Sequence, residues 1–174
     1  LYHLTKAADG TRLCSSNDGW EQVTTDICAL HDYADNKDTI SQHFADRSEV
    51  ETHACDWRPC YANTEKPTGQ EAFMVTEYGG IAFENIGIQG EMGGMQTWGY
   101  HGKVTDEEAF FARFKAVTDG VREIPYCQGY CYTQLTDVMQ EINGLLTPDR
   151  KPKMDVERVR AINQNALGRT NQLT

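Results

Sequence analysis

The chain has 174 residues, which is enough for one domain with a sizeable core. Its 16 Lys and Arg residues against 26 Asp and Glu residues give a net charge of −10. This charge disfavours nucleic acids and anionic membranes as partners, because both attract a basic face. No apolar run approaches the ~20 residues that span a bilayer, and no signal peptide is visible. The chain begins at Leu1 without an initiator Met, so we expect it to be a piece of a longer protein.

The first half of the chain contains four expected elements. A helix is expected over residues 1–8, because Asp9-Gly10 is a usual helix stop. Short strands follow at residues 12–16 and 27–30, with little room for a helix between them. A second helix is expected over residues 38–47, with apolar side chains four positions apart.

The second half of the chain begins with a short apolar strand over residues 72–76. A helix over residues 105–120 opens with Thr105-Asp-Glu-Glu108, which resembles a capping box, and is expected to stop at Asp119-Gly120. The last strand and helix are expected at residues 125–133 and 154–167. Strands that alternate with helices predict an α/β fold with parallel pairing and right-handed crossovers. The alternation alone is compatible with a four-stranded doubly wound sheet.

The six cysteines do not show the spacing of common zinc sites. They are Cys14, Cys28, Cys55, Cys60, Cys127 and Cys131. We therefore expect reduced thiols, which favours a cytoplasmic location. We expect no cofactor and no metal in this chain; a divalent cation in a longer parent stays open.

Glu77 is the candidate catalytic residue. It follows the apolar strand 72–76 and precedes Gly79-Gly80, where the backbone leaves extended geometry. A carboxylate at the C-terminal end of a buried parallel strand lies where α/β enzymes hold their chemistry. The alternative is an ordinary solvated charge at a strand end.

Three collinear segments carry a resemblance to family 2 glycoside hydrolases, which include β-galactosidases and β-glucuronidases. They are Thr76-Glu-Tyr-Gly-Gly80, Gly129-Tyr-Cys-Tyr-Thr-Gln-Leu-Thr-Asp137 with the tract 141–153, and Asn17-Asp-Gly-Trp20 with His31-Asp-Tyr33. The resemblance covers nearly the whole chain. It implies an α/β fold that is half of a (β/α)8 TIM barrel, strands five to eight with their helices, forming one partial domain over residues 1–174. A complete barrel needs ~250 residues.

The resemblance also implies the chemistry of a retaining β-glycosidase. Glu77 looks like the nucleophile, and Tyr33 resembles the phenol that holds such a nucleophile ionised. Retaining enzymes need a second carboxyl group as general acid and base. The family places it after an Asn on barrel strand four, which would precede Leu1. We therefore expect the isolated chain to be inactive, although it carries the nucleophile of an active parent.

Seven further residues are candidates for substrate binding. They are Asn17, Asp18, His31, Asp32, Trp98, Tyr132 and Gln134. Several have structural alternatives: His31 suits a rim histidine, Asn17 and Asp18 a turn, and Trp98 could tuck a long glycine-rich loop onto the domain. The resemblance also places Tyr132 beneath the sugar, beside a cis peptide bond.

The loop after the last strand bears on specificity. β-Glucuronidases carry an Asn-x-Lys motif there for the sugar carboxylate, whereas this chain has Asn143-Gly-Leu145. The resemblance therefore favours a neutral β-glycoside, such as a β-galactoside. The expected partners are a carbohydrate substrate and further copies of the chain, joined through open barrel edges. The alternative function is a non-catalytic carbohydrate-binding or interaction module on the same fold.

Overall fold

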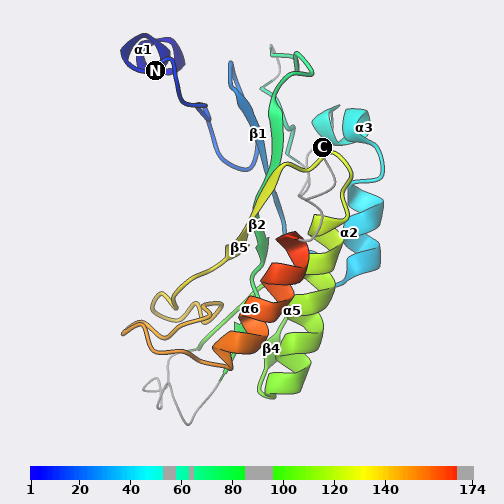
Figure 1. Ribbon diagram of the computed structural model, residues 1–174, viewed down its shortest axis with the longest axis vertical. Helices are drawn as coiled ribbons and strands as arrows, with labels where there is room; N and C mark the ends of the chain where they lie inside the picture. Colours follow the sequence, from blue (N-terminus) through cyan, green and yellow to red (C-terminus); the bar gives the residue numbers. More distant parts are fainter. Residues whose placement is uncertain (53–57, 63–64, 85–95, 168–174) are drawn as a thin grey trace.

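A parallel three-stranded sheet forms the centre of the molecule. The computed structural model describes residues 1–52, 58–62, 65–84 and 96–167. The strands are β1 (Ile27–Asp32), β2 (Ala72–Gly79) and β5 (Gly129–Thr133), in the spatial order β1-β2-β5. Both pairings are parallel, so the C-terminal ends of all three strands lie at one edge, the lower end of the sheet in Figure 1. This edge is called the C-terminal edge below.

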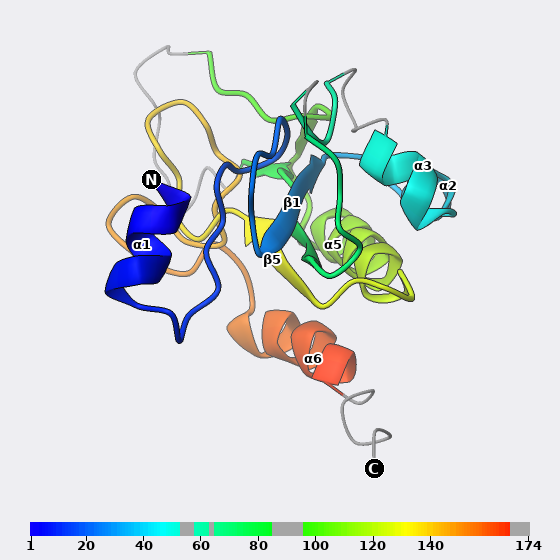
Figure 2. The same ribbon diagram turned by 90° about the horizontal axis from the view of Figure 1, so that it is seen from above.

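Helices cover one face of this sheet. They are α2 (Lys37–His43), α3 (Arg47–Thr52), α5 (Glu107–Arg122) and α6 (Val156–Leu167), and α1 (Tyr2–Ala8) lies on the opposite side (Figures 1 and 2). A second parallel pair, β3 (Ala82–Phe83) and β4 (Lys103–Val104), lies beyond the C-terminal edge. Within the described residues, no helix is long and apolar enough to cross a membrane.

The core lies between the sheet and α5. Alternate strand residues point toward the helices, as the pairing of Cys28 with Phe73 and of Leu30 with Val75 shows. These four side chains are fully buried. From α5 they meet an apolar stripe that the 3.6-residue period of the helix brings onto one side, and this stripe includes Phe110, Phe114 and Val117.

The other face of the sheet is only partly covered. Its side chains are small or apolar, and four of the five are partly exposed: Ile27, Ala72, Met74 and Gly129; Ala29 is buried. This set is called the open face below. In the described part of the chain, β1 and β5 each have a strand partner on one side only.

Several sequence predictions need correction. Residues 12–16 form no strand, so three strands of the expected four are present in the described sheet. A side-chain bond explains the difference, because Asp26 accepts a hydrogen bond from the Cys14 backbone at 2.9 Å and holds this segment as a loop. The predicted helix 38–47 is α2, which ends earlier, at His43, and a second short helix, α3, begins at Arg47.

The ends of α5 also differ from the prediction. The N-cap is Asp106 and not Thr105 as predicted. The Asp106 side chain accepts hydrogen bonds from the backbones of Glu108 and Ala109. The helix continues through Asp119-Gly120 to Arg122. Gly120 serves packing, since a Cβ there would approach Ile40 of α2 to 3.1 Å. Glycine therefore lets α2 and α5 lie close together.

The parallel α/β fold that the alternation predicts is confirmed. The cis peptide bond is Thr133–Gln134, one residue beyond the expected place. The five described cysteines form no disulfide, and Cys55 lies outside the described residues.

Candidate active site

The C-terminal edge brings Glu77 beside His31. Along β1 and β2 the pairing runs from Ile27 with Ala72 to Leu30 with Val75, and then shifts, so that His31 pairs with Glu77. Thr76 is thus an extra residue on β2. A register shift of this kind re-aims the side chains that follow it. Glu77 consequently lies on the same side of the sheet as His31.

The Glu77 carboxylate has two neighbours that can donate protons. The Tyr33 hydroxyl donates a short hydrogen bond to Glu77 Oε2. His31 Nδ1 lies 3.4 Å from the same oxygen. The Glu77 side chain keeps 36% of its surface exposed, so its carboxylate faces solvent as well as these partners. A hydrogen bond donated to a carboxylate favours the ionised form.

Aromatic packing fixes Tyr33 in this position. Its ring stacks on Tyr100, with centroids 3.5 Å apart and planes 4° from parallel. Gly80 lies beneath both rings, and a Cβ there would come within 2.3 Å of Tyr100. Burial, and then the bond to Glu77, raise the pKa of Tyr33 far above its ordinary value. Tyr33 therefore stays protonated and keeps a hydrogen to donate.

His31 links Glu77 to Asp18. Its Nε2 atom lies 3.4 Å from Asp18 Oδ1, and its side chain is only 10% exposed. The ring lies against the backbone of Gly19, where a Cβ would approach it to 2.9 Å, and against the edge of Trp20. The Thr76 hydroxyl donates to Asp18 Oδ1. Asp18, His31 and Glu77 together form the one cluster in the described residues with the spacing of metal ligands.

A second polar cluster lies in the loop after β5. The Asn143 side-chain amide donates to Glu141 Oε1 at 3.1 Å. Burial raises the pKa of Glu141; the bond from Asn143 lowers it, and the negative charge of Glu77 raises it further. Asn143 Oδ1 and Gln134 Nε2 are buried without a hydrogen-bond partner in the described chain. Buried polar groups in this state usually await water or a ligand.

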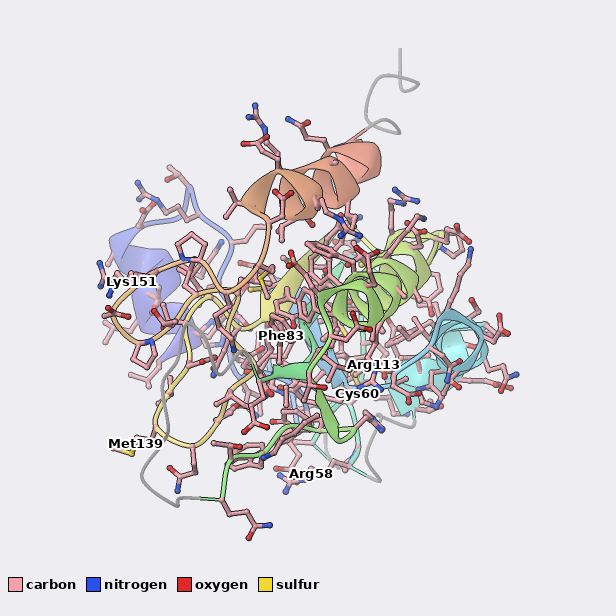
Figure 3. All side chains as sticks on the ribbon, turned by 90° about the horizontal axis from the view of Figure 1, so that it is seen from below. Arg58, Cys60, Phe83, Arg113, Met139 and Lys151 are labelled. Atoms are coloured by element: carbon pink, nitrogen blue, oxygen red, sulfur yellow. The ribbon has the colours of Figure 1, made fainter. Side chains whose placement is uncertain are left out.

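A buried ion pair supports this loop from within. Lys153 Nζ lies 2.8 Å from Asp137 Oδ1 and donates to the Ile142 carbonyl at 2.9 Å. Asp137 also accepts a bond from the Gly144 backbone. Both charged side chains are at most 2% exposed. In Figure 3, Phe83, whose ring lies near Lys153, occupies the middle of the molecule, and Met139 lies at its outer rim.

Asp32 faces away from Glu77. Its carboxylate is 2% exposed, accepts a bond from the Ala34 backbone, and lies 2.7 Å from His43 Nδ1. A cavity of about 390 Å³ adjoins it. Tyr33 and Tyr100 form one wall, so the stacked rings separate this cavity from the Glu77 carboxylate.

The remaining candidates have varied surroundings. Asn17 is exposed and bonds to the Trp20 carbonyl, which is the expected turn. Trp98 is 43% exposed and meets Tyr100 edge to face. The Tyr132 ring packs toward the core, where it meets Phe114 edge to face. The structure thus gathers Asp18, His31, Tyr33 and Glu77, and holds Asn17, Asp32 and Tyr132 in separate surroundings.

Sequence reasoning missed Thr76 and Gly19 as contributors, and it did not foresee the contact of Tyr100 with Tyr33. Thr76 bonds to Asp18, Tyr100 stacks on Tyr33, and Gly19 lies against His31. Glycine before Trp20 was a visible signal of a turn, and Tyr100 was visible as an aromatic in a glycine-rich loop. No sequence signal indicates that Thr76 contacts Asp18, because the two residues are 58 positions apart. The loop methionines Met92 and Met95 lie outside the described residues.

No protein-family model matches this chain, and no curated protein matches it. Solved structures show similar folds. A GH2 β-galacturonidase from Eisenbergiella tayi is 18% identical, with a TM-score of 0.59 over 94% of this chain. A β-glucuronidase from Faecalibacterium prausnitzii is also 18% identical, with a TM-score of 0.52 over 95% of this chain. The chain spans 29% and 27% of these two proteins. It therefore shares the fold of a part of these glycoside hydrolases.

Proposed function

We propose that this chain is the C-terminal half of a (β/α)8 TIM-barrel catalytic domain of a retaining β-glycosidase, with Glu77 as its nucleophile. The carrying observation is the hydrogen bond from Tyr33 to Glu77 at the C-terminal edge of a parallel sheet. Barrel enzymes hold their catalytic groups at this edge. The shared fold with glycoside hydrolases supports the same assignment.

The proposed reaction has two steps. Glu77 attacks the anomeric carbon, a carbon–oxygen bond to the carboxylate forms, and the bond to the leaving group breaks. Water then hydrolyses this covalent intermediate and frees Glu77. Tyr33 donates a hydrogen bond to Glu77, and a hydrogen bond of this kind favours the ionised carboxylate that attacks. The chemistry uses only carboxyl groups and water, and it needs no cofactor.

The proposal places the general acid and base outside these 174 residues. A retaining pair stands about 5–5.5 Å apart. The negative charge of Glu77 raises the pKa of Glu141. We assign Glu141 to sugar binding together with Asn143 and Gln134, because all three have polar side chains in the loop region after β5. A chain without the acid should hydrolyse ordinary glycosides hardly at all.

The test uses a substrate that needs no acid. Dinitrophenolate leaves without taking up a proton, so a dinitrophenyl 2-deoxy-2-fluoro-β-galactoside can trap the nucleophile even without the acid. We expect mass spectrometry to find one fluoro-sugar on the peptide that contains Glu77. Glu77→Gln should remain unlabelled, and Glu84→Gln, which changes an acid that pairs with Lys103, should label normally.

The contrary result is equally clear. Labelling of another residue, or equal labelling of Glu77→Gln, would exclude Glu77 as the nucleophile. In an active protein that contains this chain, Glu77→Gln should lower turnover by roughly 10⁴-fold or more, because the nucleophile is lost outright.

The proposed substrate is a neutral β-glycoside, of the β-galactoside type. Leu145 stands where a uronidase needs a cation, and it packs against the core. The two structural neighbours act on uronides according to their names, so β-glucuronide and β-galacturonide labels belong in the same experiment. Faster labelling by either would overturn the preference for a neutral sugar.

A carbohydrate-binding module without catalysis is the second candidate. The exposed ring of Trp98, edge to face with Tyr100, offers a surface on which a sugar could stack. This candidate predicts sugar binding that Trp98→Ala abolishes, with no covalent labelling of Glu77.

A further inference from the structure

We propose that Asp18, His31 and Glu77 form a binding site for a divalent transition-metal ion of the zinc class. Ion binding does not depend on the proposed hydrolysis, because it needs only these three side chains, although Glu77 belongs to both proposals. If Glu77 is also the nucleophile, a bound ion occupies the attacking carboxylate and inhibits the reaction.

The spacing of the three side chains suits one ion. One ligand atom from each residue lies within 4.8 Å of the other two. His31 faces the two carboxylates with different ring nitrogens: Nε2 lies 3.4 Å from Asp18 Oδ1, and Nδ1 lies 3.4 Å from Glu77 Oε2. Zinc bonds of ~2.0–2.1 Å in a tetrahedral site place neighbouring ligand atoms about 3.3 Å apart. An ion bound to Nε2 therefore meets Asp18 directly, and the Glu77 carboxylate must turn from Nδ1 toward Nε2 to become the third ligand.

The His31 ring gives an independent indication of a ligand. Its Nε2 atom is buried, has no hydrogen-bond partner in the described residues, and faces Asp18. An unpaired buried nitrogen is costly, and a bound ion would satisfy it. The close backbone of Gly19 holds the ring in this orientation, so the nitrogen is already aimed at the site.

Each carboxylate has a donor that orients it. Thr76 donates to Asp18, and Tyr33 donates to Glu77. Outer partners of this kind direct metal ligands and tune their affinity. The Asp18 side chain is 59% exposed and the Glu77 side chain 36%, so an ion can enter from solvent and keep water as a further ligand.

The ligand set selects the type of ion. An imidazole nitrogen with two carboxylates suits zinc, whereas magnesium and calcium prefer sites made of oxygen only. The two carboxylates also bring two negative charges to a doubly charged cation. Three protein ligands leave a coordination position open, as in zinc sites that are not purely structural.

Calorimetric titration of the 174-residue chain with zinc chloride tests the site, in a buffer that does not bind zinc. We expect one saturable site per chain, and excess magnesium should not displace the ion. Asp18→Asn, His31→Gln and Glu77→Gln should each abolish saturable binding. Thr76→Val should weaken it roughly tenfold, because an orienting donor is lost.

Two matched controls address incidental binding elsewhere. His101→Gln removes an exposed histidine and Glu108→Gln an exposed carboxylate, and both should bind zinc as the parent chain does. Circular dichroism checks the fold of every variant. If His31→Gln fails to fold, Glu77→Gln decides, because it keeps the shape of a partly exposed side chain.

Cobalt titration identifies the ligands by their spectrum. Nitrogen and oxygen ligands should give visible absorption without the near-ultraviolet band of a thiolate bound to cobalt. A thiolate band would place the ion at the cysteines and overturn the proposal. Zinc binding that survives all three ligand variants, or that disappears in His101→Gln, would overturn it as well.

Discussion

Individual side chains at the C-terminal edge act through their protonation states. Tyr33 donates to Glu77 and is enclosed by Tyr100, and burial raises its pKa. A donor that stays protonated under ordinary conditions keeps its hydrogen bond to the carboxylate. The sequence shows the residue types of this pair, and the fold supplies their contact.

The raised pKa of Tyr33 predicts a loss of stability in alkali. Below the ordinary phenol pKa of ~10, the phenol is neutral in both states and its contribution is complete. Above it the unfolded phenol ionises while the folded one resists, so stability falls as pH rises. Tyr33 should account for a decrease of at most about 1 kcal/mol in the free energy of unfolding per pH unit, after solvent screening.

Urea unfolding at neutral pH and above pH ~10 measures this effect. The chain should lose more stability over this range than Tyr33→Phe does, and the difference between the two belongs to Tyr33. Other buried phenols, such as Tyr78, contribute equally to both proteins. Identical losses would show that Tyr33 is not enclosed as described.

At the scale of elements, the loop after β5 depends on its buried ion pair. Lys153 and Asp137 tie residues from both ends of the loop together. Glu141 and Asn143 lie between these two anchors. The placement of the second polar cluster is therefore a consequence of this one contact, which sequence spacing did not indicate.

Lys153→Met should destabilise the chain strongly. Removing one partner leaves the Asp137 carboxylate buried without its cation, which costs about 3 kcal/mol or more. Adding Asp137→Asn should restore part of this loss, since Asn keeps an oxygen for the Gly144 backbone and removes the lone charge. Urea unfolding measures both. Lys151→Met, at an exposed pair with Asp149, is the control and should change little.

At the scale of the whole molecule, the helices α2, α3, α5 and α6 cover one face of the sheet, and the other face is only partly covered. The open face exposes apolar side chains such as Ile27 and Met74, and β1 and β5 have free edges within the described sheet. Free edges and partly exposed apolar faces promote association. This arrangement agrees with the proposal of half a barrel, whose inner face packs on further strands.

We expect the chain to self-associate in a concentration-dependent way. Sedimentation velocity should show dimers or larger species at high concentration. Met74→Lys should shift the distribution toward monomer, because a charge on the open face is costly to bury. Ala112→Lys adds the same charge to an exposed position of α5 and should leave association unchanged. A chain that stays monomeric at all concentrations contradicts the expectation.

The sequence by itself determined the parallel α/β class and the central strand, but this strand runs to Gly79 and not to Thr76, so Glu77 lies inside it, near its C-terminal end, and not beyond it. Apolar runs, glycine breaks and helical periodicity are local signals, and they are strong for residues 72–76 and for α5. The prediction failed at residues 12–16, where the Cys14 backbone donates a hydrogen bond to the Asp26 carboxylate and the segment is a loop. The prediction also failed at Gly120, which was expected to end the helix. In the structure the helix continues, and the glycine allows close packing against Ile40.

Only the tertiary structure decided which side chains meet. The shift that makes Thr76 an extra residue turns Glu77 toward His31, and a turn 58 residues earlier brings Asp18 to Thr76. These contacts depend on strand register and loop paths, which are set by packing across the sheet. Local sequence patterns carry no information on strand register or loop paths. The sequence therefore predicted which residues belong to the site, but not how they are arranged.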